Sequence, residues 1–257
     1  MKIKFIGTGS GKTSLYRYHT SFLISSANQN ILVDCGDGIS KAILNQNISF
    51  NSIDCIIISH LHSDHFAGLP SLLTQMKLTG RNKSLSVFVH SSEREFIEDF
   101  IFHSYLFKER IHFEFKIIAF DDEIEIQVTE NFNFTARLNS HLDKYKKYDT
   151  EKKLSFASLS FLFKDEENSL IYSGDIGSEK DLYLFNQKAD LFITETTHTE
   201  VENVVKILEK LNPGKLVLTH IGEDLEESLG KYLESLSEHL KSRVILTFDG
   251  LELNHFK

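Results

Sequence analysis

The segment 60–65, which reads HLHSDH, contains four side chains that bind transition metals: His60, His62, Asp64 and His65. Imidazole and carboxylate groups are common ligands of zinc and related divalent ions. Two imidazoles at positions i and i+2 can reach one cation, while the adjacent Asp64 and His65 can turn toward a second cation nearby. A polar turn with incidental histidines is the alternative, but so dense a cluster favours a metal site.

The elements around this cluster are predicted by its flanks. The preceding residues 55–59 form the β-branched run CIIIS, which is typical of a buried strand in a parallel sheet. After the cluster, apolar residues recur at helical spacing at Leu69, Leu72, Leu73 and Met76. The cluster therefore lies in a loop from strand to helix, at the edge where open α/β sheets usually build their sites.

The His-x-His-x-Asp-His pattern resembles that of the metallo-β-lactamase fold superfamily. The resemblance implies three more ligands in the order His, Asp, His, and candidates follow apolar strands over 132–138, 169–173 and 215–218: His141, Asp175 and His220. It also implies an α/β fold, a four-layer αββα sandwich with the site between the sheets. We expect one domain over residues 1–257, because the resemblance spans nearly the whole chain and no linker is visible.

The resemblance assigns seven residues to two divalent metal ions. His60, His62 and His141 belong to one ion, Asp64, His65 and His220 to the other, and Asp175 to both. This mixture of imidazoles and carboxylates suits zinc, with manganese and iron as alternatives. Two such ions, roughly 3.5 to 4 Å apart, lower the pKa of a bridging water, so the expected reaction is hydrolysis.

Glu195 and His198 carry the argument about substrate. Thr199 and Glu202 have the spacing of a capping box before a helical pattern, which predicts His198 at a helix N-terminus, where an anion is favoured. We expect His198 to protonate a leaving alkoxide, Glu195 to orient it, and Asp64 to ligate metal and accept a proton from water. The run His198-Thr199-Glu200 resembles the His-x-Thr element of ribonuclease Z and related phosphodiesterases. A loop histidine without a role is the alternative.

Three further features have competing interpretations. Asp34 is either a buried acceptor that orients the ligand loop or a turn residue before glycine. His90 stands alone at a strand end and is predicted to be structural. Residues 7–13, GTGSGKT, are one residue short of a phosphate-binding P-loop, and they resemble the glycine turn that passes the metal site in ribonuclease Z-like proteins.

The expected substrate is a small or cyclic phosphodiester. Ribonuclease Z enzymes that process transfer RNA precursors carry a long arm, whereas only residues 142–174 separate His141 from Asp175 here, with a short basic loop at 144–148. Transfer RNA processing is the alternative function. A thioesterase or lactonase of the same fold needs no His198, and a metal or ligand sensor shows no turnover.

Composition sets the remaining expectations. A net charge of -9 and a pI of about 5.7 oppose a general nucleic-acid coat, so RNA is a doubtful partner. No leader pattern or membrane-length apolar run is present, which favours the cytoplasm and no membrane partner. Cys35 and Cys55 are expected to be free thiols. The broad apolar face of 93–107 predicts either core burial or contact with substrate or a partner subunit, so a homodimer is retained.

Overall fold

Two seven-stranded sheets form the centre of the computed structural model, which describes residues 1–254. The first sheet has the order β14-β1-β2-β3-β4-β5-β6. Its strands are β1 (Lys2–Gly7), β2 (Ser21–Ser26), β3 (Gln29–Val33), β4 (Cys55–Ile57), β5 (Leu85–His90), β6 (Phe115–Phe120) and β14 (Glu252–Asn254). The second has the order β13-β12-β11-β10-β9-β8-β7. Its strands are β7 (Glu125–Thr129), β8 (Phe132–Leu138), β9 (Leu159–Asp165), β10 (Ser169–Tyr172), β11 (Leu191–Thr194), β12 (Lys215–Leu218) and β13 (Val244–Leu246).

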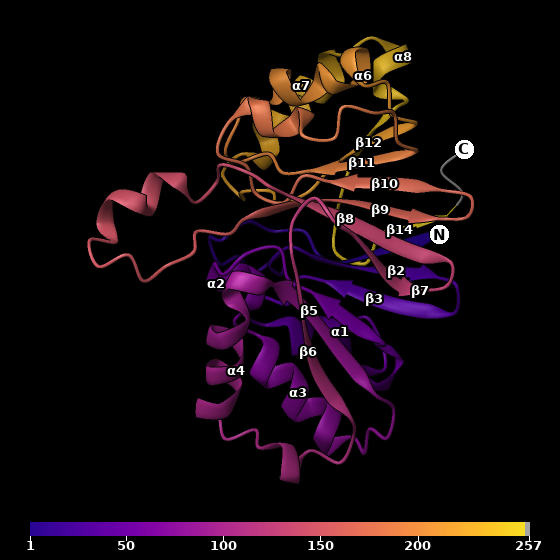
Figure 1. The fold of residues 1–257 in the computed structure, drawn as a ribbon. Helices are drawn as coiled ribbons and strands as arrows, with labels where there is room; N and C mark the ends of the chain where they lie inside the picture. Colours follow the sequence, from indigo (N-terminus) through magenta and orange to yellow (C-terminus); the bar gives the residue numbers. More distant parts are fainter. Residues whose placement is uncertain (255–257) are drawn as a thin grey trace.

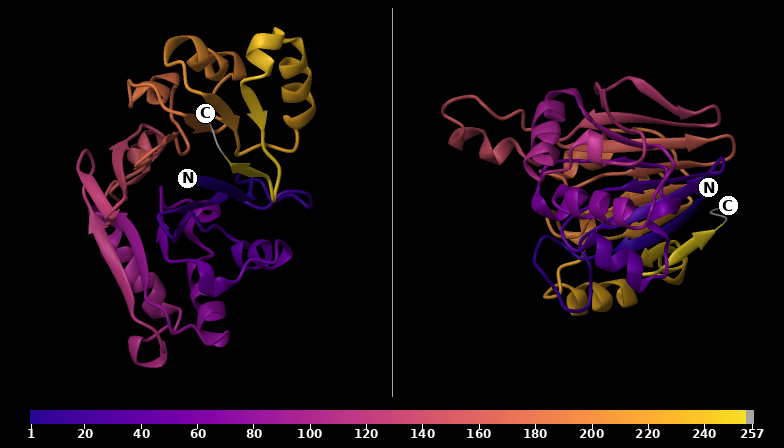
Figure 2. Two further views of the ribbon diagram at one scale, coloured as in Figure 1. Left: turned by 90° about the vertical axis from the view of Figure 1, so that its right-hand side faces the viewer. Right: turned by 90° about the horizontal axis from the view of Figure 1, so that it is seen from below.

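Helices cover the outer face of each sheet (Figure 1 and Figure 2). On the first sheet lie α1 (Ile39–Asn45), α2 (Ser63–Phe66), α3 (Leu69–Leu78) and α4 (Arg94–His103); on the second lie α5 (Val201–Val205), α6 (Ile207–Lys210), α7 (Glu226–Ser235) and α8 (Glu238–Lys241). Short 3-10 turns are η1 (Phe50–Ser52), η2 (Ser91–Glu93), η3 (Lys108–Arg110), η4 (Asp143–Tyr148) and η5 (Glu179–Tyr183). This is the predicted four-layer αββα sandwich.

The continuous apolar runs of the strands follow from burial on both faces. In β3, Ile31 and Val33 pack between the sheets, whereas Leu32 packs under the helices. In β9, Phe161 packs between the sheets and Leu162 faces the helices of the second half. Because side chains alternate along a strand and both faces are covered, nearly every position must be apolar.

The predicted elements are largely present, with three differences. Leucines recur at helical spacing over 225–240 and predict one terminal helix, but the segment forms two, because Leu236 adopts extended backbone after α7 and Ser237 caps α8. The helical pattern after residue 199 is also split into α5 and α6. The pairing of β14 with β1 is not predicted from sequence, because a three-residue strand carries too little pattern. Among the described residues, no helix is long and apolar enough to cross a membrane.

Residues 142–157, hereafter the arm, project from the body of the sandwich (Figure 1; right panel of Figure 2). The sequence predicts only a short basic loop within this stretch, but the structure forms η4 there and extends it outward. Tyr148 and Leu154 are 72% and 66% exposed. The arm is nevertheless brief, since β9 begins at Leu159.

Candidate metal centre

The seven predicted ligands converge at one edge of the two sheets. His60 follows β4, His141 follows β8, Asp175 follows β10 and His220 follows β12. Strands β8 and β10 both run antiparallel to β9, so their carboxyl ends meet at the same edge. Asp64 and His65 lie on the single-turn helix α2, which the chain forms directly after the β4 loop.

These side chains form two groups. Within each group, the possible ligand atoms all lie within 4.8 Å of one another. The first group contains His60, His62, His141 and Asp175; the second contains Asp64, His65, Asp175 and His220. Asp175 belongs to both, because its Oδ2 lies 3.8 Å from His141 Nε2 and 3.3 Å from His220 Nε2. Its Oδ1 lies 3.5 Å from His65 Nε2. The two groups contain the same residues as the two predicted ligand sets, and the assignment of these sets to metal ions stays a prediction.

The donor set fits divalent cations. His60 Nε2, His65 Nε2 and Asp175 Oδ1 are buried and have no hydrogen-bond partner among the described residues. A buried polar atom without a partner is costly, and such atoms rarely gather by chance. Cations bound between the two groups would satisfy all three atoms, since neutral imidazole nitrogens and carboxylate oxygens are donors to zinc-like ions.

The opposite nitrogen of each buried imidazole is held by a neighbour. His65 Nδ1 lies 2.8 Å from Asp34 Oδ2, and His220 Nδ1 lies 3.0 Å from the Thr197 hydroxyl. His60 Nδ1 lies 3.1 Å from Ser59 Oγ, and His141 Nδ1 lies 3.3 Å from the Ile176 carbonyl. Such outer contacts fix ring orientation and leave Nε2 free to bind.

Asp34 is buried and accepts hydrogen bonds from three elements. The Ser59 amide and hydroxyl donate to it at 2.7 and 2.8 Å, and the Tyr172 hydroxyl donates from the second sheet at 3.2 Å. With the His65 contact, these bonds favour the orienting interpretation over the turn interpretation. Asp34 has a φ of 60°, an uncommon left-handed conformation, so surrounding contacts hold it in place.

Ser59, Tyr172 and Thr197 are functional candidates that sequence reasoning missed. Ser59 precedes a ligand and Thr197 precedes His198, and Tyr172 lies three residues before Asp175. Their adjacency to the motifs was the only available signal, because a hydroxyl beside a motif is usually a turn or core residue.

Burial and neighbouring charges have opposite effects on the pKa values of the site residues. Burial lowers the pKa of His60 and, despite Asp175, lowers the pKa of His141 to about 4. Burial also acts to lower the pKa of His65, but the charges of Asp175 and Asp34 outweigh it and raise that pKa. For Asp175, burial acts to raise the pKa, and the surrounding imidazoles hold it well below its usual value. Both Asp175 and Asp64 are thus carboxylates at neutral pH.

His198 lies beside both groups and is positioned by Glu195. Its Nδ1 is 2.9 Å from Glu195 Oε1, and its amide donates to Oε2 at 2.9 Å. The His198 ring centroid is 4.7 Å from that of His141 and 5.8 Å from that of His220. Burial acts to raise the pKa of Glu195, but the hydrogen bond from His198 outweighs it and lowers the pKa. Glu195, His198 and His220 also form a third cluster within 4.8 Å.

The predicted capping box is wrong. Helix α5 begins at Val201 with Glu200 as its N-cap, and no side chain caps it. Its five residues are too few to give a substantial dipole. Glu195 and the end of β11 therefore position His198, and no helix dipole attracts an anion to it.

The glycine-rich segment approaches the site as its resemblance implies. A Cβ on Gly11 would lie 3.0 Å from Asp64 Oδ2, and Gly9 pairs with Ile221, the residue after His220. The absence of a side chain at Gly11 thus lets the backbone pass the Asp64 carboxylate.

His90 and the cysteines lie outside these clusters. His90 Nδ1 contacts the Ser92 hydroxyl at 2.6 Å at the start of η2, and the residue is in neither ligand group. Cys35 and Cys55 are buried free thiols.

Comparisons with known proteins agree with this geometry. The chain is 24% identical over 292 residues to a ribonuclease Z of Archaeoglobus fulgidus, covering 95% of this chain and 94% of that protein. The structure of the metallo-β-lactamase fold protein YhfI from Bacillus subtilis matches with a TM-score of 0.75 and 20% identity, over 98% of each chain. Human tRNase Z, short form (ELAC1), matches with a TM-score of 0.73 and 20% identity, over 99% of each.

These relatives place the chain in the ribonuclease Z-like branch of the metallo-β-lactamase fold superfamily, as a metal-dependent hydrolase. The fold implies divalent metal ions, for which the two groups supply donors. A family profile described as "Anti-Pycsar protein Apyc1" matches residues 1–238. Because that match covers most of the 257 residues of the chain, the chain belongs to the Apyc1 anti-Pycsar protein family.

Proposed function

We propose that this protein is a phosphodiesterase that hydrolyses small or cyclic phosphodiesters, with the seven residues of the two groups as ligands of two divalent metal ions, zinc by donor type. The observation that carries the proposal is the pair His198 and Glu195. His198 is outside the predicted ligand set, and its ring lies beside His141 of the first group and His220 of the second. Its Nδ1 contacts the buried Glu195 carboxylate, so Nε2 is the atom that can act on a substrate.

The metal ions, when bound, would polarise the phosphoryl oxygens and favour ionisation of an attacking water. Asp64 is ionised at neutral pH and lies at the second group, so its carboxylate accepts the proton that the water loses. As the bond from phosphorus to the leaving oxygen breaks, Nε2 of His198 donates a proton to that oxygen. Glu195 holds the imidazole in position through Nδ1, and its negative charge stabilises the protonated ring.

Ribonuclease activity is the second candidate, because a curated relative with matching length is a ribonuclease Z. The small-substrate proposal rests on two features of this chain. The arm is short, and the protein has a net charge of -9, so it offers few sites for the several phosphate contacts that a folded RNA needs. Thioester or lactone hydrolysis is less well supported, because neither reaction requires His198.

The test compares kcat/KM for an activated aryl phosphodiester, a nucleoside cyclic monophosphate and a transfer RNA precursor at near-physiological salt. We expect the small diesters to be cleaved more efficiently. Accurate removal of the precursor's 3′ trailer at higher efficiency would instead establish a ribonuclease Z function. Turnover of a thioester with none of any phosphodiester would reject both phosphodiesterase assignments.

A further inference from the structure

Two loops that carry predicted ligands from the second sheet meet beside the candidate metal centre. Residues 139–141, hereafter the His141 loop, follow β8, and residues 173–178, hereafter the Asp175 loop, follow β10. The backbones of the two loops touch, because a Cβ on Gly177 would lie 2.3 Å from the Ser140 carbonyl oxygen. Only a residue without a side chain allows so close an approach. The geometry of the first ligand group therefore depends on how these loops are held together.

Asp181, a residue of η5 that is 7% exposed, joins the two loops through one carboxylate oxygen. Its Oδ2 accepts hydrogen bonds from the Ser140 hydroxyl at 2.7 Å and from the Ser140 amide at 3.2 Å. The same oxygen accepts bonds from the Gly177 amide at 2.9 Å and from the Ser178 amide at 3.1 Å. Two donors thus come from each loop, so a single buried atom sets the separation of the loops.

These bonds exceed what the local turn requires. The bond from the Ser178 amide caps η5, which begins at the next residue. The bonds from Ser140, in contrast, span 41 residues of the sequence and reach the residue directly before His141. Hydrogen bonds to a carboxylate are roughly twice as strong as those between neutral groups. The Asp181 carboxylate can therefore fix the position of the His141 loop as well as that of its own turn.

We infer that Asp181 is a positioning residue that holds His141 and Asp175 at the separation at which they bind one cation. The inference rests on the ligand assignment in the proposed function and adds a residue outside the seven ligands. Asp181 acts through Ser140 and Gly177 rather than through a ligand side chain. Its loss should affect the first ligand group more than the second, because the first group contains both His141 and Asp175 and the second contains only Asp175.

The test measures zinc affinity by competition with a chromogenic chelator, using full-length protein from which metal has first been removed. Asp181→Ala removes the shared acceptor and should weaken binding of one zinc ion by about tenfold or more, the range for groups that orient metal ligands. Asp181→Asn keeps an oxygen that can accept these bonds and should recover most of the lost affinity. A general loss of stability does not predict this recovery of zinc affinity.

Asp165→Ala is the matched control for Asp181→Ala. Asp165 also accepts hydrogen bonds from a hydroxyl and from backbone amides, but it lies at the end of β9 away from the ligand groups. Denaturant unfolding should show that both alanine variants are less stable than the wild-type protein, because both lose a set of charge-assisted hydrogen bonds. Only Asp181→Ala should lose zinc affinity.

A second variant separates the loops without changing Asp181. Gly177→Ala places a Cβ against the Ser140 carbonyl oxygen at an unrelaxed distance of 2.3 Å, so one loop must move away from the other. We expect its zinc affinity to fall in the same direction as that of Asp181→Ala. Gly230→Ala on α7 is the control, because its Cβ would meet no neighbouring atom within 4 Å. This pair of variants decides the question if Asp181→Ala does not fold.

The outcomes separate the inference from the ligand assignment. If Gly177→Ala and the folded Asp181 variants bind zinc as tightly as the wild-type protein, Asp181 has only a structural role. That result overturns the inference and leaves the ligand assignment intact. If the wild-type protein itself binds no zinc, the ligand assignment fails and the inference fails with it.

Discussion

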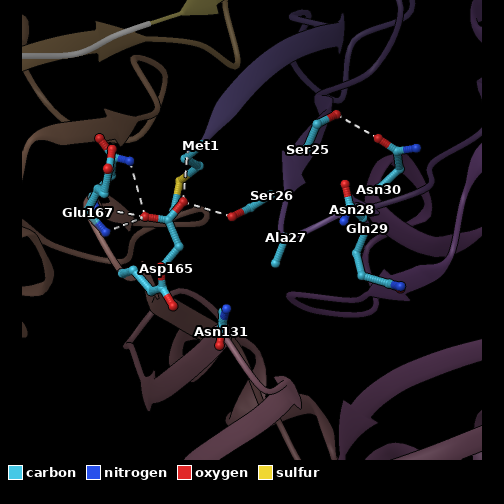
Figure 3. Close-up of a pocket in the computed structure, with 12 residues that line it drawn as sticks. Met1, Ser25, Ser26, Ala27, Asn28, Gln29, Asn30, Asn131, Asp165 and Glu167 are labelled. Atoms are coloured by element: carbon cyan, nitrogen blue, oxygen red, sulfur yellow. Dashed lines mark hydrogen bonds and ion pairs between the residues drawn. The ribbon is translucent and has the colours of Figure 1, made fainter.

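Asp175 and Asp165 are two carboxylates at opposite ends of neighbouring strands, and their surroundings differ in a way that separates chemistry from structure. Asp165 ends β9 at the edge away from the ligand groups, beside a polar cavity (Figure 3). It accepts hydrogen bonds from the Ser26 hydroxyl at 2.7 Å and the Asn168 amide at 2.7 Å, and it pairs with the Met1 ammonium at 3.0 Å.

Asp175 has no comparable set of donors. Its Oδ1 is buried without a hydrogen-bond partner in the described part of the chain, and the imidazoles of His65, His141 and His220 lie 3.3 to 3.8 Å from its carboxylate oxygens. A carboxylate that its own chain satisfies stabilises a turn and joins two sheets. A buried carboxylate that the chain leaves unsatisfied, ringed by imidazoles, is arranged for a cation.

The largest expected effect is at Asp175. Asp175→Ala should remove at least one of about two metal ions per chain and nearly all activity, because this side chain is shared by both groups. Elemental analysis and steady-state turnover check the prediction. Retention of both ions and full turnover would show that Asp175 does not bridge the groups.

His198 tests whether the residue beside the ligand groups acts on substrate or on metal. His198→Ala should keep the wild-type metal content and lose turnover by about 10²-fold or more, the range for a general acid or charge stabiliser. His198 also lies within a possible ligand cluster with Glu195 and His220. Release of metal by the variant would therefore assign it to the ligands instead.

Asp34 should have a smaller effect, through the orientation of His65. Asp34→Asn preserves size and suits the left-handed backbone, but it removes the charge that faces His65 Nδ1. Metal affinity, measured by competition with a chromogenic chelator, should fall by about 10- to 100-fold. Ser40→Ala, on an exposed hydroxyl of α1, is the control. Unchanged affinity would mean that the three protein donors to Asp34 have only a structural role.

Asp165 provides the converse case and the smallest expected effect. Asp165→Asn should lower the free energy of unfolding by about 1 to 2 kcal/mol, the cost of disturbing a set of charge-assisted hydrogen bonds, without changing metal content or turnover. Denaturant unfolding measures this, with the exposed Glu167→Gln as control. If Asp165→Asn lost bound metal, Asp165 would affect the metal centre, and its assignment to a purely structural role would be wrong.

The difference in unfolding free energy between wild type and Asp165→Asn should depend on pH with a defined sign. Burial acts to raise the pKa of Asp165, but the Ser26 and Met1 contacts and two backbone amides lower it to about 2. Because the pKa is lower in the folded state than in the unfolded state, the carboxylate stabilises the protein fully above pH ~4. The difference between wild type and Asp165→Asn should shrink as the pH falls toward 2.

Much of the fold and ligand set follows from local sequence. Apolar runs predict the buried strands, and apolar residues at helical spacing predict the helices. The ligand candidates are the HLHSDH segment and three residues that follow strands, His141, Asp175 and His220, and the structure brings them together. These features are readable because buried strands must be apolar on both faces, so that polar ligands stand out where a strand ends. Helix boundaries at 199–205 and 225–240 were less predictable, since turns inside an apolar pattern depend on packing.

Tertiary structure alone decided how the ligands are oriented and what lies beside them. The Tyr172 hydroxyl reaches Asp34 from the other sheet, and the Thr197 hydroxyl reaches His220 across β11 and β12. Likewise, a cavity lined by His62 exists only because the arm packs near Phe96, some 50 residues earlier in the chain. No local pattern encodes these contacts, because each depends on the register and spacing of strands that are distant in sequence.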